Sequence, residues 1–209
     1  MRKPNPDLRQ QIMEAALALV IEAGQEGIAM RDLAVRCGIT ATTIYYYWKD
    51  KDSLLEALKF HCLSGMDAAI ARRIETAQKE TNNTLLILRH GLEAFRDWVL
   101  ANPGIALLVM SGFKPDTQAE AEKLDQYYIS SRRAEALVAA AVAKGLCSSC
   151  NPRMDSSLCI AALWGALESV LLKRSWPDFW ERGQELSDRT IDMCLHWLQS
   201  GGKSTKEVL

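Results

Sequence analysis

The apolar and polar positions along the chain follow a helical pattern almost throughout. Apolar residues recur at the i, i+3, i+4 and i+7 spacing of one helix face, whereas the strict alternation and the Val/Ile/Thr runs of β-strands are missing. Gly, Pro, Asn and Asp punctuate these segments where helices begin or end. The pattern predicts helices at about residues 8–23, 30–37, 41–48, 51–79, 84–101, 104–111, 117–144, 155–173 and 184–200.

The lengths of these segments predict two parts. Three short helices come first and six longer ones follow, so we expect an all-α protein of about nine helices. The first part is a small head at residues 1–50, and the second is a larger helical body at residues 51–209. A chain of 209 residues is long enough for one large domain or two smaller ones.

Composition narrows the class of protein further. The chain has 25 Lys and Arg against 26 Asp and Glu, and 48% of its residues are hydrophobic, which excludes wholesale disorder. It lacks a run of about 20 uncharged apolar residues, so we expect no membrane span. Six cysteines without a secretory signal favour reduced thiols in the cytoplasm over a disulfide framework.

Residues 30–51 carry the most informative motif. Ala34, Gly38 and Ile44 are spaced at +4 and +6 across the end of one helix and the start of the next. The small Ala34 lets the second helix cross closely, Gly38 permits a left-handed backbone in the turn, and Ile44 anchors the second helix. This spacing predicts a helix-turn-helix. An ordinary helical hairpin, which also uses glycine at a helix end, is the alternative.

The outward side chains of the second helix favour DNA binding. With Ile44 and Trp48 facing inward, the exposed positions are Thr40, Ala41, Thr42, Thr43, Tyr45, Tyr46 and Tyr47. No acidic residue occurs between Ile39 and Lys49. Small hydroxyl-bearing side chains can reach base edges in a major groove, whereas Tyr hydroxyls, Lys49 and Lys51 suit phosphate oxygens. Three adjacent tyrosines can also fill a core, but a helix directs at most one of them inward.

Residues 24–55 resemble the DNA-binding domain of the TetR family of bacterial transcriptional regulators. The resemblance rests on the run IYYYWKDKDSLL at residues 44–55 and extends over roughly residues 8–60. It implies DNA contacts by Arg31, Thr40, Ala41, Thr42, Thr43, Tyr45, Tyr46, Tyr47 and Lys51. Ala29 departs from the Thr or Ser that often begins the second helix of the family, which puts that helix cap and one phosphate contact in doubt.

The head carries little net charge for a DNA-binding part. Residues 1–51 hold seven basic and six acidic side chains, a net charge of +1. Affinity for DNA must therefore come from the placement of charges and from two-fold repetition. We expect a homodimer on a palindromic operator of double-stranded DNA, as is usual for helix-turn-helix proteins.

The last two predicted helices are the candidates for the dimer interface. Small and apolar residues form one stripe at Leu158, Ala161, Ala162, Gly165, Ala166 and Ser169. A second stripe runs through Leu186, Thr190, Ile191, Cys194, Trp197 and Leu198. Together with their two-fold copies, the stripes would form a four-helix bundle. The alternative is that they pack inside the core of their own body.

The resemblance implies a small-molecule effector bound in the body. The large side chains that we expect to line its pocket are Trp98, Met110, Phe113, Tyr127, Tyr128 and Trp164, and the alternative is that they fill the core. Scarce charge in these helices predicts a mostly apolar or aromatic ligand. We therefore expect a repressor that the ligand releases from its operator. A regulator that responds to a protein partner or to thiol oxidation is the alternative.

Catalytic and metal-binding patterns are missing from the sequence. It has no Ser/His/Asp, paired-carboxylate or HExxH constellation, and it holds only three histidines. Cys147 and Cys150 form a CxxC pair without the second pair that a zinc ribbon needs. We expect no enzyme, no cofactor and no metal site, and a thiol switch at this pair is the remaining alternative.

Overall fold

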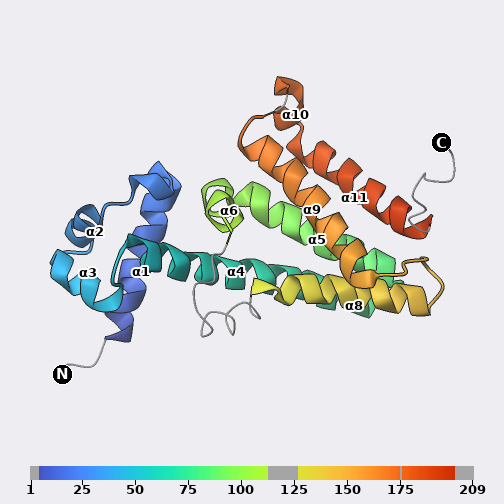
Figure 1. Cartoon of the computed structure of the whole chain (residues 1–209), viewed down its shortest axis with the longest axis horizontal. Helices are drawn as coiled ribbons and strands as arrows, with labels where there is room; N and C mark the ends of the chain where they lie inside the picture. Colours follow the sequence, from blue (N-terminus) through green and yellow to red (C-terminus); the bar gives the residue numbers. More distant parts are fainter. Residues whose placement is uncertain (1–4, 113–126, 175, 201–209) are drawn as a thin grey trace. The chain divides into compact units, whose positions relative to one another are not determined.

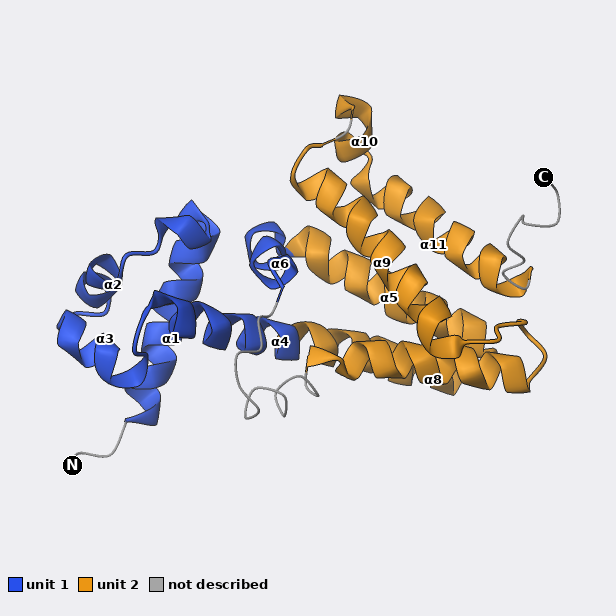
Figure 2. Cartoon of the chain, viewed as in Figure 1, with its two compact units in different colours: residues 1–64, 102–114 blue, residues 65–101, 115–209 orange. Residues whose placement is uncertain are grey.

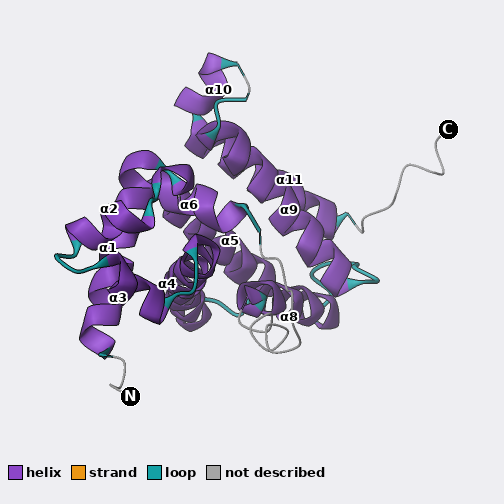
Figure 3. Ribbon diagram, turned by 60° about the vertical axis from the view of Figure 1, so that its left-hand side comes forward, coloured by secondary structure: helices purple, strands orange, loops and turns teal. Residues whose placement is uncertain are grey.

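The computed structural model describes residues 5–112, 127–174 and 176–200. These residues form helices and connecting loops, without a β-strand among them, as the apolar pattern predicts (Figure 3). The helices are α1 Pro6–Ala23, the 3₁₀-helix η1 Gln25–Gly27, α2 Met30–Arg36, α3 Ala41–Tyr47, α4 Lys51–Glu80, α5 Thr84–Ala101, α6 Pro103–Met110, α8 Ile129–Ala143, α9 Pro152–Leu171, α10 Pro177–Glu181 and α11 Gly183–Gln199 (Figure 1).

Local signals in the sequence set several of these helix ends. Gly24 and Gly38 follow α1 and α2 with φ values of 71° and 66°, the left-handed region that favours glycine. At the start of α4 the Asp50 carboxylate accepts a hydrogen bond from the Ser53 backbone N–H at 2.7 Å. The Ser53 hydroxyl in turn accepts one from the Asp50 N–H at 3.2 Å. This reciprocal cap fixes the turn between α3 and α4.

Two elements differ from the sequence prediction. The segment around Trp176 and Pro177, which we expected to be a loop, contains the short helix α10. Its start signals are Pro177 at the first helical position and Asp178 in the first turn, and five residues are too few to show a helical period. The predicted helix at residues 117–144 is interrupted at Tyr128, which has non-helical φ and ψ of −100° and 12°. Residues 117–126 of that prediction lie outside the described residues.

The chain divides into two compact units. Unit 1 comprises residues 1–64 and 102–114, and unit 2 comprises residues 65–101 and 115–209 (Figure 2). The predicted head at residues 1–50 therefore lies inside a larger unit that also holds the first half of α4 and all of α6. The local spacing of apolar residues does not reveal contacts between segments so far apart in the sequence.

Helix α6 belongs to unit 1 because it completes that unit's core. Leu108 is 1% exposed and lies in one apolar cluster with Ile12, Leu33 and Ile44. At Gly104 a methyl group would come within 3.4 Å of the Ile21 Cα, so α6 runs close to the end of α1. The three-helix head is thus stabilised by a fourth helix from later in the chain.

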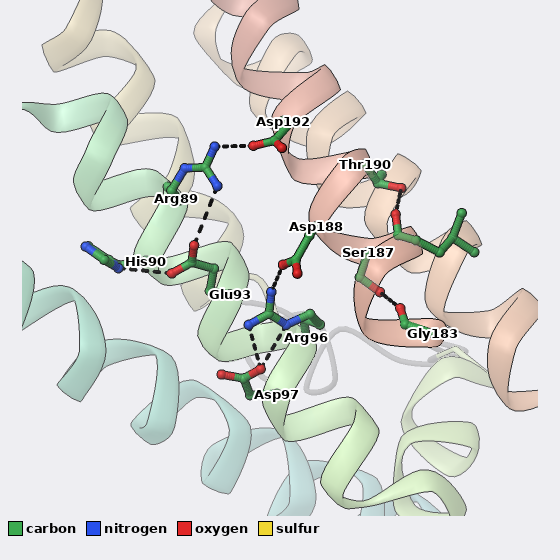
Figure 4. A network of polar contacts seen from close by, with 11 residues as sticks. Arg89, His90, Glu93, Arg96, Asp97, Gly183, Ser187, Asp188, Thr190 and Asp192 are labelled. Carbon is green, nitrogen blue, oxygen red and sulfur yellow. Dashed lines mark hydrogen bonds and ion pairs between the residues drawn. The ribbon is translucent and has the colours of Figure 1, made fainter. Parts of the chain in front are cut away.

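Unit 2 is built from α5, α8, α9 and α11 together with the second half of α4. Val99, Leu163 and Leu167 have no exposed surface and form part of its core. A polar network joins α5 to α11 (Figure 4). The Arg96 guanidinium, on a residue only 6% exposed, donates a hydrogen bond to Asp97 at 2.8 Å and another to Asp188. These carboxylates compensate a buried charge that would otherwise destabilise the unit.

Helix α9 is the one described helix that is long and apolar enough to cross a membrane by length and composition. Core helices of proteins without a membrane span meet the same criterion. Helix α9 contains Arg153, Asp155 and Glu168, and it packs against α8, α11 and α5. Apolar residues of α9 therefore pack against the neighbouring helices of unit 2.

Candidate nucleic-acid interface

The turn between α2 and α3 is closed by backbone hydrogen bonds. The Gly38 N–H donates to the Val35 carbonyl at 3.1 Å, and the Ile39 N–H donates to the Ala34 carbonyl at 3.0 Å. Ala34 is 3% exposed and Ile44 has no exposed surface, so α2 and α3 share one apolar contact below the turn. This is the helix-turn-helix that the spacing of Ala34, Gly38 and Ile44 predicts.

Threonine side chains organise the first turn of α3. Thr40 is the N-cap, and its hydroxyl accepts a hydrogen bond from the Thr43 backbone N–H at 3.3 Å. The two hydroxyls of Thr40 and Thr43 also lie 2.9 Å apart and hydrogen-bond to each other. Thr42 is exposed and Ala41 is half-buried. The start of α3 thus presents small side chains, and threonine hydroxyl and methyl groups can contact base edges.

The three tyrosines of α3 have different surroundings. Tyr45 and Tyr46 are each 50% exposed, whereas Tyr47 is half-buried. The Tyr47 hydroxyl accepts a hydrogen bond from the Asn5 N–H at 3.0 Å and donates one to the Asn5 carbonyl at 3.3 Å. Tyr47 is therefore the one tyrosine turned toward the protein, in line with the limit that helix geometry sets.

The basic side chains predicted to contact DNA also differ in how accessible they are to solvent. The side chain of Lys49 is 84% exposed and lies 3.9 Å from the Asp50 carboxylate. The Lys51 ammonium donates a hydrogen bond to the Glu26 carbonyl at 3.2 Å, which leaves two of its three N–H groups for another acceptor. Arg31 is exposed on α2. Lys49 and Arg31 are therefore the most accessible cations among the candidates.

The helix ends around this surface carry two further features. Ala29 caps α2 without a side-chain hydrogen bond, as its departure from the usual Thr or Ser predicts.

Arg36 binds Glu22 through two hydrogen bonds of 2.6 and 2.7 Å, and this contact holds the pKa of the Glu22 carboxyl below its ordinary value. Hydrogen bonds from Ser53 lower the pKa of Asp50 in the same way. Both acids are therefore ionised at neutral pH.

Sequence reasoning missed two residues at this end of unit 1. Asn5 caps α1 by accepting a hydrogen bond from the Asp7 N–H at 3.0 Å, so α1 begins at Pro6, earlier than we predicted. The Arg9 guanidinium lies 5.2 Å from the centroid of the Trp48 ring. The pair Asn5-Pro6 is a helix-start signal that could have revealed the first of these contacts.

The predicted dimer stripes separate into exposed and buried positions. On α9, Leu158 is 49% exposed, Gly165 is exposed, and Ala162, Ala166 and Ser169 are half-buried. On α11, Trp197 is half-buried, but Ile191, Cys194 and Leu198 are 0%, 5% and 1% exposed. These last three residues lie in the core of their own unit, because α11 turns its most apolar face toward α5 and α9. Their place in a dimer interface stays a prediction, and their burial within unit 2 leaves little of their surface for a partner.

The predicted ligand-binding residues do not form one described cluster. Met110 belongs to unit 1, and Phe113 lies outside the described residues. The other four predicted residues belong to unit 2. There the rings of Tyr127 and Tyr128 pack edge to face, with their centroids 5.1 Å apart. Trp98 is half-buried. The ring centroids of Trp164 and Phe95 lie 4.7 Å apart, in an edge-to-face arrangement. A pocket lined by all six side chains stays a prediction.

The CxxC pair does not form a compact thiol site. Cys147 is buried, with its thiol 3.9 Å from the Val138 carbonyl, whereas Cys150 is exposed, and both are free. Within the described residues, His, Cys, Asp and Glu side chains form no group that could hold a metal ion.

Comparison with known proteins agrees with the geometry of unit 1. The family model for bacterial regulatory proteins of the tetR family matches residues 12–58. The tetracycline repressor protein class D of Escherichia coli is 33% identical over 90 residues. Residues 12–58 thus match the DNA-binding domain of the TetR family. The match with the repressor covers 43% of this chain and 41% of the repressor's own length, so the likeness in sequence extends over less than half of either protein.

Solved structures extend the likeness of this chain to the whole fold. A protein of unknown function from Rhodococcus sp. RHA1 has a TM-score of 0.75 at 18% identity, covering 95% of this chain and 100% of that chain. AibR, solved in complex with isovaleryl coenzyme A and operator DNA, has a TM-score of 0.58 at 17% identity and covers 89% of this chain and 97% of that chain. At these identities the likeness shows the fold alone.

Proposed function

We propose that this TetR-family protein is a transcriptional repressor in the cytoplasm that binds a palindromic operator as a homodimer. The observation that carries the proposal is the outward face of α3, which combines small hydroxyl-bearing side chains with tyrosines. It has no acidic residue between Ile39 and Lys49, and the turn before it is closed by backbone hydrogen bonds. Such a face can enter a major groove without repelling phosphates. Arg31, Lys49 and Lys51 would contact the backbone.

Two exposed apolar stripes in unit 2 support dimerisation. On α9, Met154 and Leu158 are 56% and 49% exposed, and the exposed Gly165 lies on the same face about two turns after Leu158. On α11, Met193 is 59% exposed and Trp197 is half-buried beside it. Small and apolar side chains on two packed helices suit close approach to a second copy of the pair. The interface would thus use Met193 and Trp197 in place of Ile191, Cys194 and Leu198.

The proposed effector is a small, mostly apolar molecule bound in unit 2. Trp98, Tyr127, Tyr128 and Trp164 offer aromatic surface there, and AibR provides a precedent for an acyl-coenzyme A ligand on a similar fold. Binding would release the operator only if the ligand favours a conformation in which both recognition helices no longer reach their half-sites.

Helix α4 offers a place where such a change could occur. It contributes residues 51–64 to unit 1 and residues 65–80 to unit 2, and the pair Ser64-Gly65 lies at that boundary. The Ser64 hydroxyl donates to the Phe60 carbonyl at 2.9 Å, and a Cβ added at Gly65 would meet no atom within 4 Å. Helices bend most readily at Gly/Ser pairs and where a serine bonds back to the preceding turn.

The proposal is tested by selecting the fragments that the full chain binds from the genome of its source. We expect a shared palindrome with half-sites separated by about 10 base pairs or a multiple of that spacing. Binding that depends on salt but shows no common sequence would contradict the proposal. Once the operator is known, thermal-shift measurements of the protein with a panel of metabolites identify its ligands. A ligand that leaves the affinity for the operator unchanged would exclude ligand-induced release.

A further inference from the structure

Helix α10 connects the two helices of the proposed dimer surface, and it exposes large aromatic side chains. Trp176, the residue before its first turn, is 77% exposed, and Phe179, three positions later, is 47% exposed. Helix α10 lies where α9 ends and α11 begins, and it packs against both helices (Figures 1 and 3). Exposed aromatic surface next to an exposed apolar helix face is typical of an interaction site.

The aromatic side chains of α10 follow the apolar face of α9. Leu158 and Leu172 stand seven residues before and after Gly165, a spacing of about two turns that places all three on one side of the helix. Leu158 is 49% exposed and Leu172 is 38% exposed. Gly165 is exposed as well, and a Cβ added there would meet no atom within 4 Å. This face therefore has a large apolar side chain toward each end and open space at its middle.

The equal spacing on either side of Gly165 favours a second copy of the chain as the partner. In a two-fold dimer both copies use the same surface, so that surface must be complementary to itself. When two antiparallel copies of α9 cross at Gly165, Leu172 of one copy lies next to Leu158 of the partner subunit. Trp176 then extends toward Met154 of the partner subunit, and Met154 is 56% exposed.

The charges around α10 disfavour a nucleic acid or an anionic lipid as the partner. Asp178 is exposed on α10 itself. The Lys173 ammonium lies 5.0 Å from the centroid of the Trp180 ring. The Arg174 guanidinium lies 3.5 Å from the Glu168 carboxylate. The two cations that precede α10 in the sequence thus already have partners, whereas a phosphate-binding surface depends on available cations.

The exposed aromatic surface is large enough to matter for a stable dimer. Aromatic side chains bury about 150–250 Å² each when they are fully covered, so Trp176 and Phe179 at their measured exposure offer about 250 Å² per copy. Stable interfaces bury about 1,200–2,000 Å² in total, and the two copies of α10 would provide at least about a quarter of this area.

We propose that α10 is a dimerisation arm, whose Trp176 and Phe179 pack against the apolar end of α9 in the partner subunit. This inference rests on the proposed homodimer. It adds an aromatic contact outside the stripes of α9 and α11, and it names the surface that the arm covers, around Met154 and Leu158 of the partner subunit.

The first test removes both aromatic rings from the full chain and measures the dimer directly. The double variant Trp176→Ser/Phe179→Ser should raise the dimer dissociation constant at least about 100-fold, because a few aromatic side chains usually dominate the affinity of an interface. Sedimentation over a range of protein concentrations measures this constant, and far-ultraviolet circular dichroism confirms the helix content. A dissociation constant equal to that of the wild type would overturn the inference.

A matched control removes exposed apolar surface from unit 2 at positions outside α9, α10 and α11. Leu86 and Tyr128 are 40% and 47% exposed, and the double variant Leu86→Ser/Tyr128→Ser should keep the wild-type dissociation constant. An equal rise in the control would mean that the loss of any exposed apolar surface weakens the dimer, and would also overturn the inference.

The second test locates the contact by photo-crosslinking. The full chain with a benzophenone side chain in place of Trp176 should form a covalent dimer on irradiation, with the cross-link in residues 150–160 of the second copy. Cross-links to any other segment, or none between copies, would overturn the inference. If the wild type sediments as a monomer, the proposed homodimer itself fails. A dimeric wild type with an unchanged Trp176→Ser/Phe179→Ser variant contradicts the role of α10 alone.

Discussion

Helices α3 and α9 both leave one side without cover from their own unit, but the two uncovered sides differ in chemistry. The outer side of α3 carries Thr42, Tyr45 and Tyr46, which are exposed and bear hydroxyl groups. The outer side of α9 carries Met154 and Leu158, each about half exposed. One surface is polar and the other is apolar, although both belong to helices of the same all-α chain.

This difference indicates which partner each surface has and for how long. Exposed apolar surface is unfavourable in water by about 25 cal/mol per Å², so the proposed dimer would stabilise the α9 face by covering it permanently. The α3 face has no such need, because hydroxyl groups exchange hydrogen bonds with water for bonds to DNA at little net cost. This contrast is consistent with the proposed constitutive dimer that binds and leaves its operator reversibly.

The largest expected effect comes from placing charge on the apolar side. The double variant Leu158→Asp/Met193→Asp should turn the dimer into a monomer, since four carboxylates would be desolvated in the interface. Operator affinity should then fall by about 10²–10⁴-fold, because the two half-sites are no longer bound together. Sedimentation and DNA titration measure both effects.

A control for this variant uses polar positions of α11. Gln184→Asp/Gln199→Asp adds the same charge at exposed residues directed away from Met193. We expect it to remain a dimer with unchanged operator affinity. A Leu158→Asp/Met193→Asp protein that is still dimeric would place the interface on another surface.

The next largest effect concerns the helix that completes unit 1. Leu108→Ala should lower the free energy of unfolding by about 2–5 kcal/mol, because Leu108 is 1% exposed in the core that supports α2 and α3. Leu86→Ala removes the same atoms from a residue that is 40% exposed in unit 2 and should cost far less. Chemical denaturation measures both values, and equal losses would contradict the assignment of α6 to the DNA-binding unit.

Glycine substitutions at two helix positions of unit 2 should change stability in opposite directions. Gly65→Ala should raise the free energy of unfolding by about 0.5–1 kcal/mol, because the new methyl group meets no atom within 4 Å and alanine is the better helix former. Gly183→Ala should lower it, since its Cβ would lie 2.6 Å from Val170 Cγ1. Thermal melting compares the two variants, and destabilisation by Gly65→Ala would show that α4 is bent or crowded at this position.

The smallest effect is a pH dependence that differs between the units. In unit 2, burial raises the pKa of Asp67, which is 7% exposed, even though Ser130 donates a hydrogen bond to it. The folded protein therefore binds this proton more tightly than the unfolded chain. The contribution of Asp67 to stability falls as pH rises from the ordinary aspartate value through the raised pKa.

The carboxylate of Asp50 in unit 1 has the opposite dependence. Its pKa is lowered by hydrogen bonds from Ser53, so its contribution is present above the ordinary value and is lost as pH falls through the lowered pKa. We expect Asp67→Asn to gain stability relative to the wild type as pH rises, and Asp50→Asn to lose it. Unfolding curves between pH 3 and 7 measure both slopes, and slopes of the same sign would contradict this account.

Local chemistry in the sequence was sufficient to predict the helix-turn-helix. Gly38, Thr40 and Asp50 each act within a few residues of their own position, through a left-handed turn, a helix cap and a reciprocal hydrogen bond. Ile44 was predicted from spacing alone because a buried anchor recurs at a fixed offset from the turn. The all-α fold and the exposed tyrosines follow from the same periodicity.

Features that depend on contacts between distant segments could not be predicted. Helical period identifies an apolar stripe but not the surface that covers it, so Ile191, Cys194 and Leu198 were assigned to a partner although they pack inside unit 2. Leu108 enters the core of unit 1 from about 60 residues beyond α3. The hydrogen bonds of Tyr47 to Asn5 join residues 42 positions apart, which no local pattern reveals.

The central claim, that the face of α3 binds DNA, is tested most directly at Thr42. Fluorescence anisotropy of a labelled operator is titrated at 0.15 M salt with the wild type and with Thr42→Glu, a substitution at an exposed position that should leave the melting temperature unchanged. We predict a wild-type Kd of about 10⁻⁸–10⁻¹¹ M. The variant should bind at least about 100-fold more weakly, because a carboxylate in the groove faces phosphates and base acceptors. Equal affinities for the two proteins would contradict the account.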